Sequence, residues 1–457
     1  MPDLLDVRFS VNSRENAYRR IQDEMFIRGL NPRAPSRYHV LDGFGAAVFE
    51  FVEEKPRAAG EVVAHARKLK GDGGAELEAD VLDFLYHMVR LGLFNSPDRD
   101  LILDKLSPRP APGGEPPAAD GEAEAFDACN YMYGRAYELM LPFKVDIEVT
   151  YACNLRCRHC YAAHEPPKHL ATSEVVSLLD QLAELGCLEL VFTGGEMFLR
   201  PDMLDLIAHA RRLNFAVTLL TNATLITPDI ASGLAELMPE HVSASIYGGR
   251  PETHDAFTGV EGSLERTVTG ARLCAERGLR VLNTYVLTNE NCHERHLVRR
   301  LMADNGLDYK STVLLFPRTD MDPSPMDYRL TDEQLREVML DGSFTPIRTR
   351  CNSGRSRFRV APDGTVHPCE LMRLTLGSLR RLDFRTILET STLLKDLRQK
   401  DFNNPPECAE CEKWRNCPRC SGVAFLETGD PMRRWPEGCR IATIYASIPE
   451  PQRPRRR

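Results

Sequence analysis

The sequence contains no long run of apolar residues. Nothing near the N-terminus has the apolar core of an export signal, and no stretch is long enough to span a bilayer. Positive charge is also not in excess, since 58 Lys and Arg stand against 66 Asp and Glu, a formal net charge of −8. General nucleic-acid binding is therefore not expected. These absences predict a cytoplasmic protein with neither a membrane nor a nucleic acid as partner.

Cysteine, in contrast, is abundant, with 14 residues in 457. In a secreted chain this number would indicate disulfides, but without an export signal it favours metal binding. The 42% hydrophobic and 27% charged residues are typical of a globular protein. At this length two or three domains are expected.

Three cysteines follow a predicted strand, Val145–Val149. They are Cys153, Cys157 and Cys160, with three and then two residues between them. Thiolates this close in sequence can hold three irons of a cubane cluster, which leaves the fourth iron without a protein ligand. A metal with an open position is reactive. The alternatives are three free thiols or part of a zinc site.

This spacing, followed by the aromatic Tyr161, resembles the radical S-adenosylmethionine (radical SAM) superfamily. The resemblance implies that the open iron chelates the amino and carboxylate groups of SAM. It also implies that an electron from the cluster cleaves SAM and releases a 5′-deoxyadenosyl radical. An electron donor such as flavodoxin or ferredoxin is then expected as a partner.

Three further motifs lie at the ends of predicted strands and resemble SAM-binding motifs of the same superfamily. Gly194, Gly195 and Glu196 resemble its GGE motif, in which the glycines let the backbone approach a ligand and the carboxylate meets an ammonium. Thr221-Asn222 occupies the place of a Thr-Asn-Gly motif, with Ala223 instead of glycine. Ser245 matches a position that reaches the ribose or carboxylate of SAM, although its hydroxyl would also suit a turn.

Strands and helices alternate from residue 145 onward, which predicts an α/β fold with a parallel sheet. Six units suit a partial (β/α)6 TIM-like barrel, with the chemistry at the C-terminal ends of the strands. The expected strands are Val145–Val149, Leu188–Phe192, Ala216–Leu220, Val242–Ile246, Arg280–Val286 and Ser311–Leu315. Thr331 with Gln334 has the form of a capping box for a helix after the last strand.

Seven further cysteines lie near the C-terminus and resemble the SPASM extension of radical SAM enzymes, which carries two auxiliary 4Fe–4S clusters. By motif position, one cluster is expected on Cys408, Cys411, Cys417 and Cys439, and the other on Cys351, Cys369 and Cys420. The second set has three thiols and leaves room for a non-cysteine ligand or the substrate. With the first site this implies three 4Fe–4S clusters and SAM as cofactors. A four-thiolate zinc site is the alternative.

The N-terminal part predicts a helix over Ser13–Gly29, a strand at Tyr38–Leu41 and three helices over Phe44–Glu53, Ala58–Leu69 and Leu77–Leu91. The last four elements suggest a winged-helix module, and their pattern resembles the PqqD-like leader-recognition domain of peptide maturases. A plain helical subdomain is the alternative. The predicted organisation is a recognition domain at 1–106, a Pro- and Gly-rich linker with a lead-in helix at 107–140, the barrel at 141–345, the SPASM domain at 346–448 and a basic tail at 449–457.

Together these features predict an enzyme that abstracts hydrogen from a residue of a ribosomally made precursor peptide bearing a leader. An auxiliary cluster can accept the electron that a substrate radical loses, so the expected product is an intramolecular cross-link, either thioether, carbon–carbon or carbon–oxygen. Peptide epimerisation and oxidation of a protein side chain are alternatives on the same scaffold. A non-catalytic iron–sulfur protein is a further alternative from another class.

Overall fold

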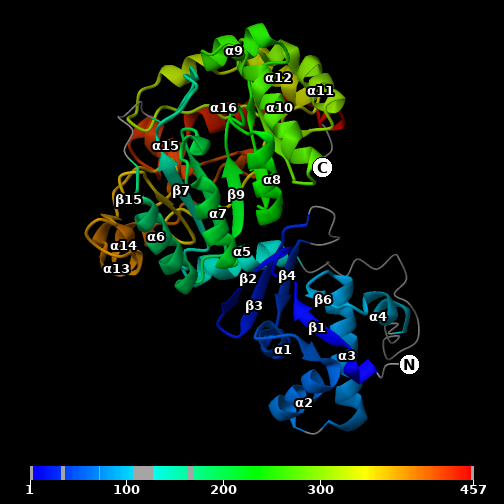
Figure 1. Ribbon diagram of the computed structural model, residues 1–457. Helices are drawn as coiled ribbons and strands as arrows, with labels where there is room; N and C mark the ends of the chain where they lie inside the picture. The colour runs from blue at the N-terminus through cyan, green and yellow to red at the C-terminus, as the bar shows by residue number, and fades with distance from the viewer. Residues whose placement is uncertain (1–3, 32–36, 72, 106–126, 163–168, 454–457) are drawn as a thin grey trace. The chain divides into compact units, whose positions relative to one another are not determined.

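The computed structural model describes residues 4–31, 37–71, 73–105, 127–162 and 169–453. The chain divides into two compact units, Met1–Arg135 with Asn214–Ala216, and Ala136–Leu213 with Val217–Arg457 (Figure 1). Most of the expected linker and the last four residues of the expected basic tail fall outside the described residues. No helix in the described part of the chain combines the length and apolar character needed to cross a membrane.

The described residues of the N-terminal unit form two small sheets, with strand orders β2-β3-β4 and β5-β1-β6, and the helices α1 to α4, with most of α5 at the end of the unit. The strand predicted at Tyr38–Leu41 is confirmed as β4, and the three predicted helices are confirmed as α1, α2 and α3. Their side chains build one apolar core. The bounds of the elements are β1 Arg8–Val11, β2 Asn16–Ile21, β3 Glu24–Gly29, β4 Tyr38–Leu41, α1 Gly43–Glu53, β5 Arg57–Ala58, α2 Ala59–Lys70, α3 Gly74–Arg90, β6 Phe94–Asn95 and α4 Arg99–Lys105.

The helix predicted over Ser13–Gly29 is wrong, because this segment is the β-hairpin of β2 and β3. Six residue pairs join the two strands, from Asn16 with Gly29 to Ile21 with Glu24. Gln22, at φ 57°, takes the left-handed conformation in the turn. Nearly every residue of β3 is buried, so the strand does not show the alternation of apolar and polar residues that marks a half-buried strand.

The larger unit carries the barrel. Strands β7, β8, β9 and β10 pair in parallel in one sheet, and β11, β12 and β13 pair in parallel in another. The strand predicted at Val242–Ile246 is interrupted at Ala244, so β10 pairs with β9 while β11 pairs with β12. A bridge between Val242 and Val281 links the two sheets. The seven parallel strands, of which β10 and β11 are the two halves of one expected strand, form a partial barrel. The bounds are β7 Lys144–Thr150, β8 Glu189–Gly194, β9 Ala216–Leu220, β10 His241–Ser243, β11 Ser245–Ile246, β12 Leu282–Val286 and β13 Asp308–Thr312.

Amphipathic helices follow the strands and cover the outside of the barrel (Figure 1). Thr227 caps α8 by accepting a hydrogen bond from the Ile230 amide, and the predicted capping box of Thr331 and Gln334 starts α12. The bounds are α5 Ala128–Glu138, α6 Thr172–Glu184, α7 Met203–Arg212, α8 Pro228–Leu237, α9 Pro251–Thr258, α10 Ser263–Glu276, α11 Arg295–Asp304 and α12 Asp332–Leu340.

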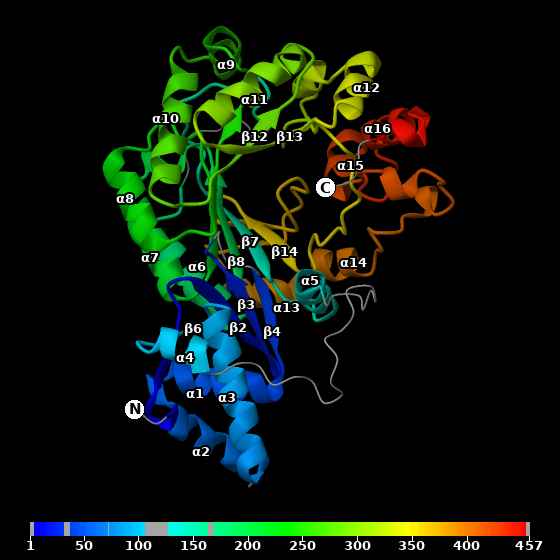
Figure 2. The same cartoon turned by 90° about the vertical axis from the view of Figure 1, so that its right-hand side faces the viewer.

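The C-terminal segment joins the barrel by strand pairing. Its strand β14 pairs in parallel with β7, so that Arg357 lies opposite Lys144 and Val360 opposite Ile147 (Figure 2). An antiparallel meander through β15 and β16 completes this seven-stranded sheet. The bounds are β14 Arg357–Val360, β15 Thr365–His367, β16 Gly377–Ser378, α13 Phe384–Thr390, α14 Thr392–Arg398, α15 Ser421–Thr428 and α16 Pro436–Ser447.

Candidate active site

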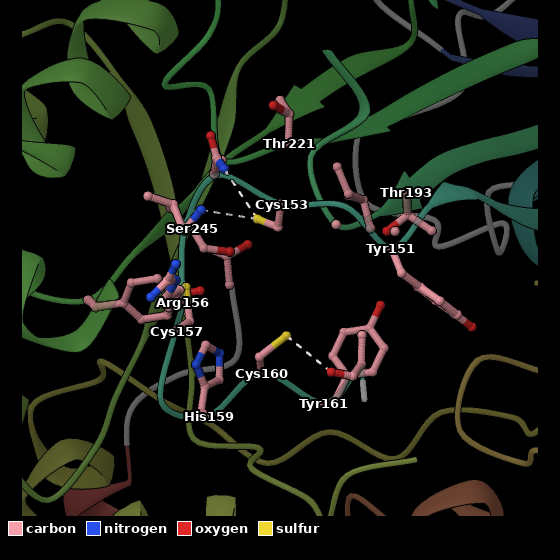
Figure 3. Close-up of a pocket in the computed structure, with 18 of the residues that line it drawn as sticks. Tyr151, Cys153, Arg156, Cys157, His159, Cys160, Tyr161, Thr193, Thr221 and Ser245 are labelled. Atoms are coloured by element: carbon pink, nitrogen blue, oxygen red, sulfur yellow. Dashed lines mark hydrogen bonds between the residues drawn. The ribbon is translucent and has the colours of Figure 1, made fainter. Parts of the chain in front are cut away.

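A cavity of about 610 Å³ opens at the C-terminal ends of the barrel strands. Figure 3 shows the three labelled cysteines of the loop after β7 around this cavity. Of the residues expected to hold the first cluster and SAM, all but one line it: Cys153, Cys157, Cys160, Tyr161, Gly194, Gly195, Thr221, Asn222 and Ser245. The sequence alone did not single out several other lining residues: Tyr151, Arg156, His159, Thr193, Tyr247 and Thr284.

The cysteine loop is held in place by α9. The Arg156 amide donates to the carbonyl of Thr258 at 2.8 Å, and the Arg158 amide donates to that of Phe257 at 3.0 Å. Asp255 in turn caps the start of α10, accepting from the amides of Gly262 and Leu264. Asp255 therefore joins the end of α9, which supports the loop, to the start of α10.

His254 is a structural histidine. Its side chain is buried, and its Nδ1 accepts a hydrogen bond from the Tyr247 amide at 3.2 Å. Burial lowers the pKa of His254 to about 4, so the ring is neutral near pH 7. It does not line the cavity.

The three loop thiols lie close enough to influence one another. Desolvation is the main cause that raises the pKa of Cys157 to about 12, and Cys160 and Cys153 add to the shift. Among the described residues no three His, Cys, Asp or Glu side chains converge as the ligands of a single metal ion do. Three thiols that face one cavity without converging suit a cubane cluster, because its irons occupy separate corners.

The two glycines after β8 allow close packing against the cysteine loop. A Cβ on Gly194 would lie 2.2 Å from the carbonyl oxygen of Thr150, and one on Gly195 would lie 2.2 Å from that of Ala152. The amides of Gly195 and Glu196 donate to these same two carbonyls, at 2.7 and 2.8 Å. The sequence predicts that the glycine pair lets a ligand approach closely. In the structure the backbone of the cysteine loop packs closely against the pair.

Glu196 is the expected site residue that does not line the cavity. It is fully buried, and its carboxylate accepts from the Thr221 hydroxyl at 2.8 Å, the Asn222 amide at 2.8 Å and the Phe198 amide at 3.0 Å. These donors use the carboxylate within the protein. The carboxylate therefore joins the end of β8 to the end of β9, and its expected contact with the ammonium of SAM stays a prediction.

The turn after β9 positions Asn222 against the cysteine loop. The Asn222 side chain donates to Asn154 at 2.8 Å and lies 3.8 Å from the sulfur of Cys153. Ala223, where the related motif has glycine, is buried with φ 60°. This left-handed conformation explains the glycine of the motif, because a Cβ is disfavoured there. Gly270 packs against the same turn, since a Cβ on it would lie 2.1 Å from the Ala223 carbonyl oxygen.

His159 and Tyr247 form the aromatic side of the cavity, and the Phe257 ring packs against both of them. The His159 ring lies 4.8 Å from that of Tyr247 and 5.1 Å from that of Phe257, between ring centroids. The Tyr247 side chain hydrogen bonds to Cys157 and counteracts the rise in the pKa of that thiol. These rings shield one side of the cysteine loop from water.

The remaining seven expected ligands form two groups. Burial, then Cys439, raises the pKa of Cys417 to about 11, and Cys408 and Cys411 contribute further. Burial, then Cys369 and Cys351, raises the pKa of Cys420 to about 12. The structure thus brings together four thiols in one place and three in another. We call them the four-cysteine group (Cys408, Cys411, Cys417 and Cys439) and the three-cysteine group (Cys351, Cys369 and Cys420).

A buried ion network connects the cavity wall to the C-terminal segment. Glu148, on β7 and fully buried, pairs with Arg359 of β14 and accepts two hydrogen bonds from Arg373, at 2.8 and 3.1 Å. The hydroxyl of Tyr151 also donates to Glu148, at 3.0 Å, and Arg359 donates to the hydroxyl of Tyr161 at 3.3 Å. Two tyrosines that line the cavity are therefore fixed by residues from both segments.

Comparison with known protein families agrees with the division of the larger unit into a barrel and a C-terminal segment. Residues 147–302 match the Radical SAM superfamily, and residues 351–412 match SPASM, described as an iron–sulfur cluster-binding domain. The structure of Streptococcus suis SuiB has a TM-score of 0.58 at 14% identity, over 94% of this chain and 99% of SuiB. The structure of anSMEcpe with bound AdoMet and Cp18Cys peptide has a TM-score of 0.52 at 18% identity, over 66% of this chain and 95% of that one. At these identities the likeness shows the fold.

Two curated relatives differ in the activity that their names give. An AdoMet-dependent heme synthase of Methanosarcina barkeri is 26% identical over 63% of this chain and 94% of its own length. A PqqA peptide cyclase of Granulibacter bethesdensis is 26% identical over 63% of this chain and 85% of its own length. Both domain matches imply SAM and more than one 4Fe–4S cluster as cofactors. The chain is a radical SAM enzyme of the SPASM type.

Proposed function

We propose that the enzyme abstracts a hydrogen atom from a residue of a ribosomally made precursor peptide and forms an intramolecular cross-link. One observation carries the proposal: the likeness to SuiB extends over 94% of this chain. The fold shared with SuiB therefore includes most of the N-terminal unit. SuiB has also been crystallised bound to precursor peptide SuiA, and a PqqA peptide cyclase is among the relatives.

Residues of the cavity would hold the cofactors as follows. Cys153, Cys157 and Cys160 would bind the first 4Fe–4S cluster, the backbone at Gly194 and Gly195 would lie beside the amino group of SAM, and Ser245 would bind its ribose or carboxylate. When bound, SAM and the clusters supply the oxidant that removes a hydrogen atom from an unactivated carbon and an exit for the second electron.

The chain's own residues give this chemistry its setting. Glu196, through Thr221 and Asn222, fixes the loops on either side of the cysteines. His159, Tyr247 and Phe257 exclude water from one side of the cysteine loop. The four-cysteine and three-cysteine groups would hold the two auxiliary clusters.

We assign leader recognition to the N-terminal unit. Strand β4 lies at one edge of the sheet β2-β3-β4, and its side chains are half-buried. A sheet edge can accept an extended peptide as an added strand, with main-chain hydrogen bonds providing affinity. The expected result is that a precursor without its leader loses at least tenfold in kcat/KM while the same core peptide with its leader is processed. Equal processing of both peptides would refute the assignment.

Mass spectrometry of the reacted peptide tests the cross-link. Forming one bond between two residues removes two hydrogen atoms, whereas epimerisation leaves the mass unchanged. Oxidation of a side chain to an aldehyde also removes two hydrogens, but only the aldehyde reacts with a hydrazide probe. A cross-link is established by a loss of two hydrogens, no reaction with the probe, and the absence of fragment ions between the joined residues. Unchanged mass would contradict the proposal.

A tetrapyrrole substrate is the second candidate. It is favoured by the heme synthase relative, whose length is matched over 94%. The two candidates separate in one experiment, in which reduced, reconstituted enzyme is offered an iron porphyrin and a precursor peptide in parallel. Modification of the porphyrin with no change in the peptide would favour the second candidate over the first.

A further inference from the structure

Arg419 is a buried cation located between the two auxiliary groups of cysteines. In the sequence it lies within Cys417-Pro418-Arg419-Cys420, so one neighbouring cysteine belongs to the four-cysteine group and the other to the three-cysteine group. Its side chain is in the interior, with the residue only 6% exposed. A guanidinium keeps its proton in proteins, so this position carries a full positive charge.

The hydrogen-bond partners of Arg419 are all neutral. Its Nη1 donates to the Ser421 hydroxyl at 2.8 Å, and its Nη2 donates to the carbonyls of Pro431 and Arg433, both at 2.9 Å. Its Nε is buried without a hydrogen-bond partner. Within the described residues no carboxylate lies within 4.0 Å of the group. The charge is thus held by dipoles, with no carboxylate to balance it.

A buried charge is unfavourable unless an opposite charge compensates it. The cysteines can supply this opposite charge, because they lose their protons when they bind iron. Arg419 adjoins both groups, because it follows Cys417 by two residues and directly precedes Cys420. Its backbone amide also hydrogen bonds to Cys417.

We propose that Arg419 is the fixed counter-charge shared by the two auxiliary clusters, stabilising their cysteinate ligands and raising their reduction potentials. The sign follows from electrostatics: reduction adds a negative charge to a cluster, and a fixed cation a short distance away favours the reduced form. Arg419 therefore acts on the clusters through its charge, and it is distinct from the residues proposed to bind SAM. The inference does not depend on which substrate is modified.

The test is a redox titration of the auxiliary clusters followed by electron paramagnetic resonance. It uses the full-length chain in which Cys153, Cys157 and Cys160 are changed to alanine, so that the auxiliary clusters alone contribute the signal and about eight irons are expected. Arg419→Gln is compared with Arg419→Lys, which keeps the charge, and with Arg415→Gln. Arg415 is the matched control because it is exposed and lies between two cysteines of the same run.

The midpoint potential of the auxiliary clusters is expected to be at least about 59 mV lower in Arg419→Gln than in the protein with Arg419. At a given solution potential this is a tenfold smaller ratio of reduced to oxidised cluster. Arg419→Lys should recover most of the shift, and Arg415→Gln should show none. If Arg419→Gln fails to retain iron while Arg419→Lys retains it, the charge is still the cause. The proposal is overturned if the Arg419→Gln midpoint equals that of Arg415→Gln, or if Arg419→Lys and Arg419→Gln lose iron equally.

Discussion

At the scale of single residues, the candidate site depends on a backbone conformation that is unfavourable for residues other than glycine. Ala223 is the clearest case, because it is buried in the left-handed region at φ 60° where the related motif has glycine. A non-glycine residue in this region costs about 1–2 kcal/mol. The turn that it forms carries Asn222, which contacts the cysteine loop.

Ala223→Gly is predicted to stabilise the protein by about 0.5–1 kcal/mol, because the gain from relieving the left-handed conformation exceeds the loss from a more flexible unfolded chain. Ala231→Gly, in the interior of α8 and also buried, is the control and should destabilise by about 1 kcal/mol. Urea unfolding followed by circular dichroism measures both. Equal destabilisation by the two substitutions would show that the left-handed conformation is not the source of strain.

At the scale of elements, the cysteine loop is supported from two sides. The turn after β8 supports it through the glycine pair, and α9 supports it through two backbone hydrogen bonds. Neither support was evident from the motif alone. The sequence predicts that the glycine pair leaves space for a ligand. The distance from a Cβ to a neighbouring backbone becomes known only when two segments more than 40 residues apart are placed side by side.

Gly195→Ala is predicted to displace the cysteine loop, since the added Cβ would lie 2.2 Å from the carbonyl oxygen of Ala152. The reconstituted variant should contain about eight irons where the unsubstituted enzyme contains about twelve, with its auxiliary clusters retained. Gly60→Ala on α2, where a Cβ would meet nothing closer than 3.4 Å, is the control and should keep all three clusters. A full iron content in Gly195→Ala would contradict the packing argument.

The support from α9 predicts a dependence on pH. Burial lowers the pKa of His254 from 6.5 to about 4, so the folded protein favours the neutral ring. Its contribution to stability is present above pH 6.5, where unfolded histidine is also neutral, and is lost as the pH falls toward 4. Between pH 7 and pH 5 this single group should remove about 2 kcal/mol of unfolding free energy.

His254→Gln should lose about 2 kcal/mol less over that interval, because glutamine can accept the Tyr247 hydrogen bond without titrating. His293→Gln is the control, with a side chain 69% exposed, and should behave as the unsubstituted protein does. Unfolding of iron-free protein at the two pH values measures the difference. The same loss in all three proteins would place the pH dependence elsewhere.

At the scale of the whole larger unit, the barrel and the C-terminal segment are joined by a parallel strand pair and a buried ion network. Glu148 lies between Arg359 and Arg373, and all three are largely or fully buried. Removing one partner of a buried pair leaves charges without compensation, which is strongly destabilising. This joint places the auxiliary cysteines in the same unit as the cavity.

Glu148→Ala is predicted to lower the unfolding free energy of the larger unit by about 3–5 kcal/mol, since two guanidinium groups would be left buried without their carboxylate. Glu276→Gln removes an exposed pair with Arg272 at 2.8 Å and should change stability by less than about 0.5 kcal/mol. Denaturant unfolding of both variants tests the contrast. Changes of similar size would mean that the network does not stabilise the joint.

The sequence predicted the architecture well where local patterns are strong, and less well where tertiary contacts decide. The alternating strands and helices and both cysteine sets were visible because their spacing is local. The hairpin of β2 and β3 was mistaken for a helix because β3 is buried throughout. The parallel pairing of β14 with β7, over more than 200 residues of separation, and the use of Glu196 within the protein have no local signal.

The central claim is that Cys153, Cys157 and Cys160 hold the cluster at which SAM is cleaved. The most direct measurement is the 5′-deoxyadenosine formed by anaerobically reconstituted, reduced enzyme, compared with the variant in which all three cysteines are alanine. The account predicts product from the unsubstituted enzyme, and none from the variant although it retains about eight irons. Equal 5′-deoxyadenosine from both proteins, or none from either, would contradict it.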